Sequence, residues 1–516
     1  MSRLSTVATL AVFLAFASVV LAAALSPNQV LFSYDDNSNG EWSLFDHLGG
    51  YSPWIPHTGI KGAADLDNSS IPAPLPESCT VNQVHLLSRH FERYPTRRVG
   101  MTMKSLVERM RLADRLHRES HKNTPLFPFL KSWKLFFDVD MATGHSEQLE
   151  QLTTRGKYAG TVRAREAGKL LRSRYLHLIP MDAEPNPYDV LEESYVDDEE
   201  EDGWPETGQH KHTSIYSCSC DRVMDTARAF GAGFFGSRQV RKSVRHVVIP
   251  DYAPSRGGDT LTPVKACSEY REDPVVGRQQ GPAMAEAYKS EYLRHTSSRL
   301  RDLYDFEFSH SDLWTMQELC GFEILATGKD TNPWCEMFTH EEWAAFEYAR
   351  DVLHYYRTGP GTPYSEVMGF LYLNATAYLL EHPDEVDSKL FLSFAHDGDL
   401  VPLITALGLF RDQEPLPASH LVPDREWRLS TVVPMGGRIV FERVSCGTAS
   451  SADSTGVRLL VNDAVTPIPG CQDQEICPLD EFLDIIKATG LRLQSFEDVC
   501  GIDSEVTGKR PSFFFS

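Results

Sequence analysis

Two short hydrophobic runs, each rich in β-branched or aromatic residues, predict buried strands that lead directly into charged side chains. Val81 to Leu87 runs into Arg89-His90, and Leu390 to Phe394 runs into His396-Asp397. In an open α/β sheet, ligands bind beyond the carboxyl ends of the strands. If the two strands are neighbours in the sheet, their charged residues meet in one crevice.

Helical spacing and composition dominate much of the remaining chain. Residues 101–118 and 161–176 carry apolar residues at helical spacing, and residues 284–356 are dense in Ala, Glu, Leu, Arg and aromatic residues without strand-like alternation. Residues 367–380 and 400–409 predict two further helices, one before and one after the second strand in the sequence. The segment 284–356 is therefore predicted to form a helical subdomain.

A glycine-rich segment, Gly231 to Gly236, matches the G-x-G-x-x-G pattern of dinucleotide-binding loops. Such a loop must follow a strand, whereas this segment follows a predicted helix from Asp221 to Phe230. Its glycines are therefore predicted to end that helix.

The first 24 residues predict a cleavable secretory signal. Arg3 is followed by an apolar run from Val7 to Val20 and then by Ala22 to Ala24, which is the order of charged, apolar and small residues in such signals. An uncleaved anchor helix is the alternative, but the alanine-rich exit favours cleavage after Ala24. No later stretch is long enough to span a bilayer, so we expect a mature chain without membrane insertion, secreted to the extracellular space or the cell wall.

Composition supports a packed globular protein, since 41% of the 516 residues are hydrophobic and 24% are charged. The formal net charge of −22 argues against a nucleic-acid partner, which would need a basic surface. The ten cysteines lack zinc-site spacing, so in an exported chain they predict disulfides, although spacing alone does not fix the pairing. Sequons at Asn68 and Asn374 are candidate glycosylation sites.

The residue types at the two strand ends indicate phosphoryl transfer without a metal or other cofactor. Guanidinium groups bind phosphate oxygens, an imidazole can attack phosphorus, and an aspartic acid can donate a proton to a leaving oxygen. From spacing alone, the alternative is a pair of unrelated surface motifs that share no site.

Both motifs resemble signatures of a known family. LLSRHFERYPT at residues 86–96 is similar to the R-H-G-x-R-x-P signature of the histidine acid phosphatases, and FLSFAHDGDL at 391–400 is similar to their His-Asp signature. Further similarity lies at residues 152–175, 220–234, 356–361, 433–446 and 457–471, so that the resemblance covers nearly all of 75–500. The pattern is most similar to secreted fungal acid phosphatases and to the acid-pH type called phytase B.

The resemblance implies a role for each matching residue. It assigns the phosphorylated nucleophile to His90 and the proton donor to Asp397, and it assigns phosphate binding to Arg89, Arg93, Arg222 and His396. Asp397 is expected to be neutral at acid pH, to protonate the leaving oxygen, and then to accept a proton from the attacking water. Arg97, Arg98 and Lys104 follow the first signature and suggest a basic rim for a polyphosphorylated substrate, although ordinary surface charge explains them equally well.

One residue departs from the family pattern, because Phe91 stands where the family has a glycine after the nucleophile. Glycine marks a close approach or a backbone conformation that bulky residues resist. Three outcomes are open: the ring narrows the pocket, reorients His90, or points into the core.

Transferred by position, the family's disulfides pair Cys79 with Cys446, Cys267 with Cys500, Cys320 with Cys335, and Cys471 with Cys477. Cys218 and Cys220 are left over, either as free thiols or as a strained local pair.

The fold implied is a three-layer αβα domain like that of phosphoglycerate mutase, with a mostly parallel central sheet and an inserted helical domain. The expected segments are the signal at 1–24, an N-terminal segment with the first core strand at 25–96, a helical insertion at 97–150, an α/β core at 151–261, a helical domain at 262–365, and the remaining α/β core with the C-terminal part at 366–516.

The sequence thus predicts a secreted acid phosphatase that hydrolyses small phosphate monoesters through a phosphohistidine, with phytate among the candidate substrates. The alternative is a catalytically impaired member that binds phosphorylated ligands, with Phe91 closing the pocket. Export and disulfides argue against an intracellular phosphotransferase or mutase. The sequence leaves open whether the chain forms a homo-oligomer.

Overall fold

The computed structural model describes residues 42–54, 74–120, 124–179, 213–236, 244–447, 454–472, 474–502 and 513–515. Internal contacts divide the chain into two units, Met1–Trp42 and Ser43–Ser516, and every element named below belongs to the second. The predicted signal at 1–24 and the sequon at Asn68 lie outside the described residues.

The second unit contains a mixed sheet, with eight strands in the described residues. The order is β3-β2-β4-β1-β5-β6-β7, and β8 pairs with β6. The parallel strands are β1 (Cys79–Arg89), β2 (Thr213–Cys218), β3 (Val244–Ile249) and β4 (Leu390–Ala395). The antiparallel strands are β5 (Arg438–Cys446), β6 (Ser454–Val461), β7 (Ala464–Val465) and β8 (Cys477–Pro478).

Helices cover both faces of this sheet. Side chains alternate between faces along a strand, so Phe391 and Phe394 of β4 point to opposite sides. The ring of Phe394 packs edge-on against Phe230 of α4 (Asp221–Phe235), whereas Phe391 contacts Phe514, which in turn contacts Tyr372 of α12 (Tyr364–Glu381). The expected α/β class, with helices on both sides of a central sheet, is thereby confirmed. The sheet is mixed rather than mostly parallel, because β5, β6, β7 and β8 pair antiparallel.

Close contact between α4 and α3 (Gly160–Tyr175) depends on glycine. A Cβ at Gly168 would lie 2.2 Å from the carbonyl oxygen of Phe230, and a Cβ at Gly233 would lie 1.9 Å from that of Arg165. Gly231 and Gly233 therefore lie inside α4, Gly233 at the contact with α3, and the prediction that they end the helix was wrong. Only Gly236, with a φ of 88°, ends it.

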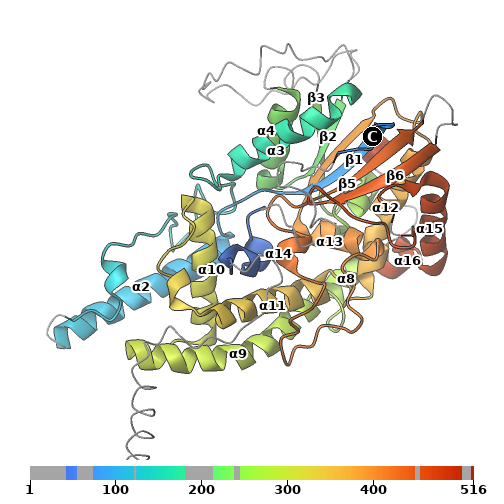
Figure 1. The fold of residues 1–516 in the computed structure, drawn as a ribbon. Coiled ribbons are helices and arrows are strands. Elements are labelled where there is room, and N and C mark those ends of the chain that lie inside the picture. The colour runs from blue at the N-terminus through green and yellow to red at the C-terminus, as the bar shows by residue number, and fades with distance from the viewer. Residues whose placement is uncertain are drawn as a thin grey trace, which may run out of the picture. The chain divides into compact units, whose positions relative to one another are not determined.

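Long helices form over the segment predicted to be helical: α9 (Gln280–Tyr304), α10 (His310–Thr327) and α11 (His340–Arg357). Helices α9, α10 and α11 lie to one side of the sheet (Figure 1). Ser309 and Thr339 begin the last two with capping boxes, whose hydroxyl and carboxylate groups satisfy free backbone N–H groups. The other α-helices of the described chain are α2 (Arg97–Ser120), α6 (Gly258–Leu261), α7 (Pro263–Ala266), α8 (Ser268–Glu272), α13 (Asp397–Ala406), α14 (Leu429–Val432), α15 (Leu479–Arg492) and α16 (Phe496–Cys500). The segment boundaries drawn from the sequence stay predictions.

All four disulfides implied by the resemblance are formed: Cys79–Cys446, Cys267–Cys500, Cys320–Cys335 and Cys471–Cys477. Cys218 and Cys220 are free thiols. Asn374 is exposed on α12. No helix in the described ranges has the length and apolar character needed to cross a bilayer.

Candidate active site

Parallel pairing of β1 and β4 aligns the ends of the two strands. Arg89 lies level with Ala395, and the backbone N–H of His90 donates a hydrogen bond to the Ala395 carbonyl at 3.1 Å. The residues that follow each strand therefore emerge at the same edge of the sheet, where the imidazole rings of His90 and His396 have their centroids 5.6 Å apart. The structure thus places both signature motifs at one site.

A cavity of about 680 Å³ lies at this edge. Its lining includes every residue predicted for catalysis or phosphate binding, namely Arg89, His90, Arg93, Arg222, His396 and Asp397. Seven arginines and lysines line the cavity against four aspartates, so its charge suits an anionic ligand although the whole chain is acidic.

The backbone of the first signature fixes the tautomer of His90. Its Nδ1 lies 2.8 Å from the carbonyl oxygen of Phe91, which can only accept a hydrogen bond, so Nδ1 carries the proton and Nε2 carries a lone pair. Burial, followed by the charges of Arg222 and Arg89, lowers the pKa of His90 well below its usual value. The shift favours the neutral imidazole, which is the form that a nucleophile needs.

Two backbone carbonyls hold one side of the Arg89 guanidinium, and the carboxylate of Asp397 lies near the other side. Nη1 of Arg89 donates to the carbonyl oxygens of Gly50 and Val433, at 2.6 Å each, and its Nη2 lies 3.4 Å from Oδ2 of Asp397. The side chain is 1% exposed. One edge of the guanidinium is thus fixed in the protein, which leaves Nη2 to interact with groups in the cavity.

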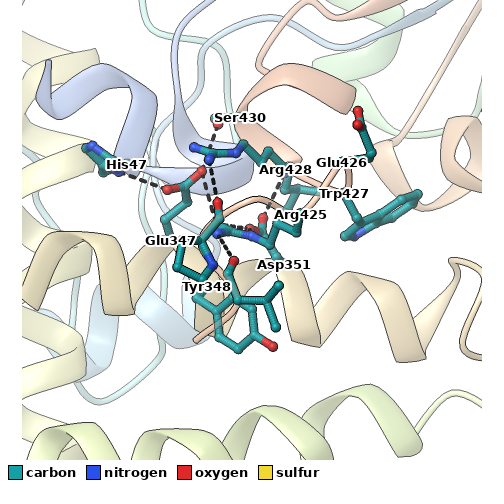
Figure 2. A network of polar contacts seen from close by, with 12 residues as sticks. His47, Glu347, Tyr348, Asp351, Arg425, Glu426, Trp427, Arg428 and Ser430 are labelled. Atoms are coloured by element: carbon teal, nitrogen blue, oxygen red, sulfur yellow. Dashed lines mark hydrogen bonds and ion pairs between the residues drawn. The ribbon is translucent and has the colours of Figure 1, made fainter. Parts of the chain in front are cut away.

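Gly50 lies in a short 3-10 turn, Gly49–Tyr51, which follows another at Leu44–His47, and a buried polar network anchors this segment through His47 (Figure 2). Nδ1 of His47 lies 2.8 Å from Oε2 of Glu347 on α11, and Arg425 lies between Glu347 and Asp351. Burial raises the pKa of Asp351 to about 7, against the opposing charge of Arg425. The network positions the segment whose Gly50 carbonyl orients Arg89.

The other two arginines come from different elements. Arg93 follows β1, donates to the carbonyl of Tyr94 at 2.9 Å, and lies over the ring of Phe322. Arg222 is in the first turn of α4, where its Nη2 lies 3.5 Å from Nδ1 of His396. Because a guanidinium only donates, Nδ1 of His396 is the acceptor and its Nε2–H points toward the sulfur of Cys218, 3.7 Å away.

Asp397 is the first residue of α13, which begins three residues earlier than the sequence predicted. His396 caps this helix, and Asp399 accepts a hydrogen bond from the His396 backbone N–H at 3.2 Å. Burial favours the neutral acid, but the positive charges around Asp397, that of Arg89 foremost, outweigh it and hold the pKa of Asp397 well below its usual value. This shift favours the carboxylate form of Asp397 in the unliganded site, whereas the sequence predicts a neutral acid at acid pH.

Phe91 does not line the cavity. Its side chain is 2% exposed in the hydrophobic core, and its ring packs on Gly436, where an added Cβ would lie 2.6 Å from Cε1 of the ring. Gly436 has a φ of 71°, and its N–H donates to the carbonyl of His90 at 3.0 Å. Of the three outcomes left open by the sequence, the ring takes the core position.

The predicted rim lies away from the cavity. Arg97 and Arg98 are exposed at the start of α2, and Nζ of Lys104 donates to the carbonyl of Val139 at 2.6 Å beside a separate surface hollow. None of the three lines the cavity. The other positively charged residues that line the cavity are Lys265, Arg278, Arg350 and Arg357.

The sequence analysis missed several residues that line the cavity. Tyr51 carries Arg350 on its ring, with 4.1 Å between the guanidinium carbon and the ring centroid, and His354 lies 3.9 Å from Asp397. Arg350 and His354 are on one face of α11, and their spacing of four residues is the only signal that could have grouped them.

Among the described residues, one cluster has side chains of the metal-ligating types: Cys471, Cys477 and Glu481. The two cysteines form a disulfide, so their sulfurs are not available as thiolate ligands. The expectation that catalysis needs no metal stays a prediction.

The sequence matches the model of the histidine phosphatase superfamily (branch 2) over residues 80–195 and 202–462. It is 30% identical over 520 residues to an acid phosphatase, PHO1, of Komagataella pastoris, covering 99% of this chain and 98% of the relative. It is 28% identical to a phytase, PHO112, of Candida albicans, covering 90% of this chain and 88% of that one.

Among solved structures, the fold is similar to that of a phytase from D. castellii, with a TM-score of 0.72 and 24% identity over 93% of this chain and 94% of that one. The family match spans both strand-end motifs and more than half of the sequence. The chain therefore belongs to the histidine phosphatase superfamily, branch 2, as its two signatures predict.

Proposed function

We propose that this phosphatase hydrolyses phosphate monoesters in acid through a phosphohistidine at His90. The observation that carries the proposal is the fixed tautomer of His90, which leaves a lone pair on Nε2 of a ring that lines the same cavity as Arg89, Arg93 and Arg222. A neutral imidazole surrounded by guanidinium groups can attack an anionic phosphorus centre whose charge those groups neutralise.

In the first step, Nε2 of His90 forms a bond to phosphorus while the bond from phosphorus to the ester oxygen breaks. The three arginines stabilise the charge on the equatorial oxygens. Asp397 gives its proton to the leaving alkoxide.

Asp397 must gain that proton after the substrate has bound. The bound phosphate brings negative charge close to the carboxylate and takes up the charge of Arg89, and both effects favour the protonated acid. A phosphomonoester in acid is a monoanion that carries a proton of its own. It can therefore enter the site with the proton that Asp397 later delivers.

In the second step, Asp397, now a carboxylate, takes a proton from water as the water oxygen attacks phosphorus. The bond between phosphorus and Nε2 breaks, its electron pair returns to the imidazole, and inorganic phosphate leaves.

The binding-only alternative requires Phe91 to close the pocket. Its ring lies in the core and the cavity keeps about 680 Å³, so the geometry favours turnover. The test is phosphate release from p-nitrophenyl phosphate between pH 3 and 7, with chelator present, by the native chain and by His90→Ala. Turnover by the native chain alone supports the proposal. Binding of inorganic phosphate by the folded native chain without turnover would favour the alternative.

We further propose that polyphosphorylated substrates such as phytate are accepted. Arg278 is exposed, Arg357 is half-buried, and both line the cavity beyond the residues assigned to the reacting phosphate. Their charges can meet phosphate groups that are not being hydrolysed. Arg278→Ala should raise KM for phytate several-fold and leave KM for p-nitrophenyl phosphate unchanged, whereas equal effects on both would contradict this role.

We also propose that the chain is exported through residues 1–24 to an extracellular location. Four disulfides in one chain agree with an oxidising compartment. Recovery of a mature chain beginning at Leu25 from culture medium would support export, whereas retention inside the cell with an intact N-terminus would contradict it.

A further inference from the structure

A second histidine, outside both signatures, contacts the proposed proton donor. His354 lies in the last turn of α11, is 2% exposed, and lines the cavity. Its Nε2 is 3.9 Å from Oδ2 of Asp397, and its Nδ1 is buried with no hydrogen-bond partner in the described structure. A buried polar side chain without a full set of partners, facing a cavity, requires an explanation.

The contacts of Asp397 distinguish its two carboxylate oxygens. Arg89 and His354 both approach Oδ2, at 3.4 Å and 3.9 Å. Oδ1 is therefore the oxygen available to carry a proton to the leaving group. A carboxyl group that is held through one oxygen presents the other in a defined direction.

Arg89 cannot hold Asp397 throughout the reaction. Its Nη1 is already bound by the carbonyls of Gly50 and Val433, so Nη2 is the part of the fork that can turn to a phosphate oxygen. Once it does so, the remaining contact of Asp397 described in the structure is His354.

A neutral imidazole suits that task better than a cation would. Burial, followed by the charges of Arg350, Arg357 and Arg89 and against that of Asp397, lowers the pKa of His354 well below its usual value. A neutral ring can donate Nε2–H to Oδ2 without adding a charge that opposes protonation of Asp397. The separation of 3.9 Å exceeds a hydrogen bond, but such bonds are often long before substrate binds and shorten in the complex.

We propose that His354 is a positioning residue for the proton donor: when the phosphate ester takes up Arg89, His354 donates Nε2–H to Oδ2 of Asp397 and directs Oδ1, with its proton, toward the leaving oxygen. The inference rests on the proposed function, because it assigns a partner to the acid of that mechanism.

The leaving group provides a readout that a purely structural role would not change. The p-nitrophenolate ion leaves without protonation, whereas the alkoxide of glycerol 2-phosphate needs a proton. His354→Leu should lower kcat/KM for glycerol 2-phosphate by roughly 10- to 100-fold, the range for loss of a hydrogen bond to a charged group, because Asp397 becomes a carboxylate as its proton moves to the leaving oxygen. It should lower kcat/KM for p-nitrophenyl phosphate by less than about three-fold on the same argument.

Two amide variants sharpen the test. In His354→Gln the amide nitrogen reaches the position of Nε2 and can donate to Oδ2, so the ratio of the two kcat/KM values should stay close to the native one. In His354→Asn the amide nitrogen reaches only the position of Nδ1, so the ratio should match that of the leucine variant. Val352→Ala, on the same helix but outside the cavity lining, controls for loss of packing and should not change the ratio.

A double variant tests whether His354 acts through Asp397. Asp397→Asn should show the same selective loss toward glycerol 2-phosphate, and adding His354→Leu should lower activity no further. Equal losses on both substrates, an unchanged ratio in all three His354 variants, or additive losses in the double variant would each overturn the inference. Failure of the proposed function would look different, since the native chain would then hydrolyse neither substrate.

Discussion

Replacing Phe91 with alanine tests whether the aromatic ring belongs to the core or to the catalytic pocket. The ring is 2% exposed and packs on Gly436, so its removal should leave a cavity in the core. Buried phenylalanine-to-alanine changes cost about 3–5 kcal/mol of unfolding free energy. Because the ring does not line the active-site cavity, kcat/KM for p-nitrophenyl phosphate at a temperature well below the unfolding midpoint should stay within about three-fold of the native value.

The partner change is Gly436→Ala. The new Cβ would lie 2.6 Å from the Phe91 ring, and the φ of 71° adds strain of its own. Overpacking costs about 1–3 kcal/mol and a left-handed backbone about 1–2 kcal/mol. Gly408→Ala is a matched control, since Gly408 has a φ of 72° but its Cβ would lie 4.0 Å from the nearest side-chain atoms, those of Pro469.

These numbers predict a coupled pair. When Phe91→Ala is also present, Gly436→Ala should no longer lose unfolding free energy through overpacking and should lose it only through backbone strain. The two changes should therefore show a coupling free energy of about 1–3 kcal/mol. Urea denaturation of the four forms and of Gly408→Ala measures it. If Gly436→Ala is no less stable than Gly408→Ala, the close contact between Gly436 and the Phe91 ring is refuted. A ten-fold gain in kcat/KM in Phe91→Ala would show that the ring obstructs the active site.

Three further changes probe the site and the core. Arg222→Ala removes a guanidinium from the reacting phosphate and should lower kcat by about 10²- to 10³-fold with the fold intact, whereas a smaller effect would place Arg222 outside the transition state. Burial raises the pKa of Asp399 to about 7, above that of an unfolded chain, so the stability it contributes is complete below about pH 4 and is lost as pH rises to 7. Asparagine at position 399 stays neutral, so between about pH 4 and pH 7 the urea midpoint of Asp399→Asn should fall less than that of the native chain. Equal falls in the two midpoints would contradict the raised pKa of Asp399. Phe514 is 1% exposed and contacts Phe391 of β4, so Phe514→Ala should lower the free energy of unfolding by about 3–5 kcal/mol. An unchanged thermal unfolding midpoint would show that the C-terminal aromatic residues do not pack on the sheet.

The sequence carried most of the information about the strand-end residues. Hydrophobic runs that end in Arg89-His90 and His396-Asp397 located β1 and β4, and the rule for parallel sheets predicted where a ligand binds. Whether the two strands are neighbours is a property of the whole sheet, and only the pairing of Arg89 with Ala395 settles it.

The residues that sequence reasoning missed act across large separations in the chain. His354 and Arg350 lie on a helix whose aromatic and aliphatic residues predict a packed element, and nothing local shows which face meets Asp397. Phe91 is likewise explained by Gly436, far along the chain, whose missing side chain makes room for the ring.

The predicted end of α4 and the predicted start of α13 were wrong. Gly233 disfavours a helix by propensity, yet α4 continues through it because α3 approaches too closely for any side chain. Helix α13 begins at Asp397 because His396 and Asp399 form its cap, and histidine is not among the usual capping residues.

Trapping of the phosphoenzyme tests the central claim most directly. The native chain is mixed with radiolabelled p-nitrophenyl phosphate at acid pH, quenched within milliseconds, and digested. The mechanism predicts label that is stable in alkali and labile in acid, on the peptide that contains His90, and no label in a folded His90→Ala chain. Turnover by the native chain without a labelled intermediate, or with label on another residue, would contradict the account.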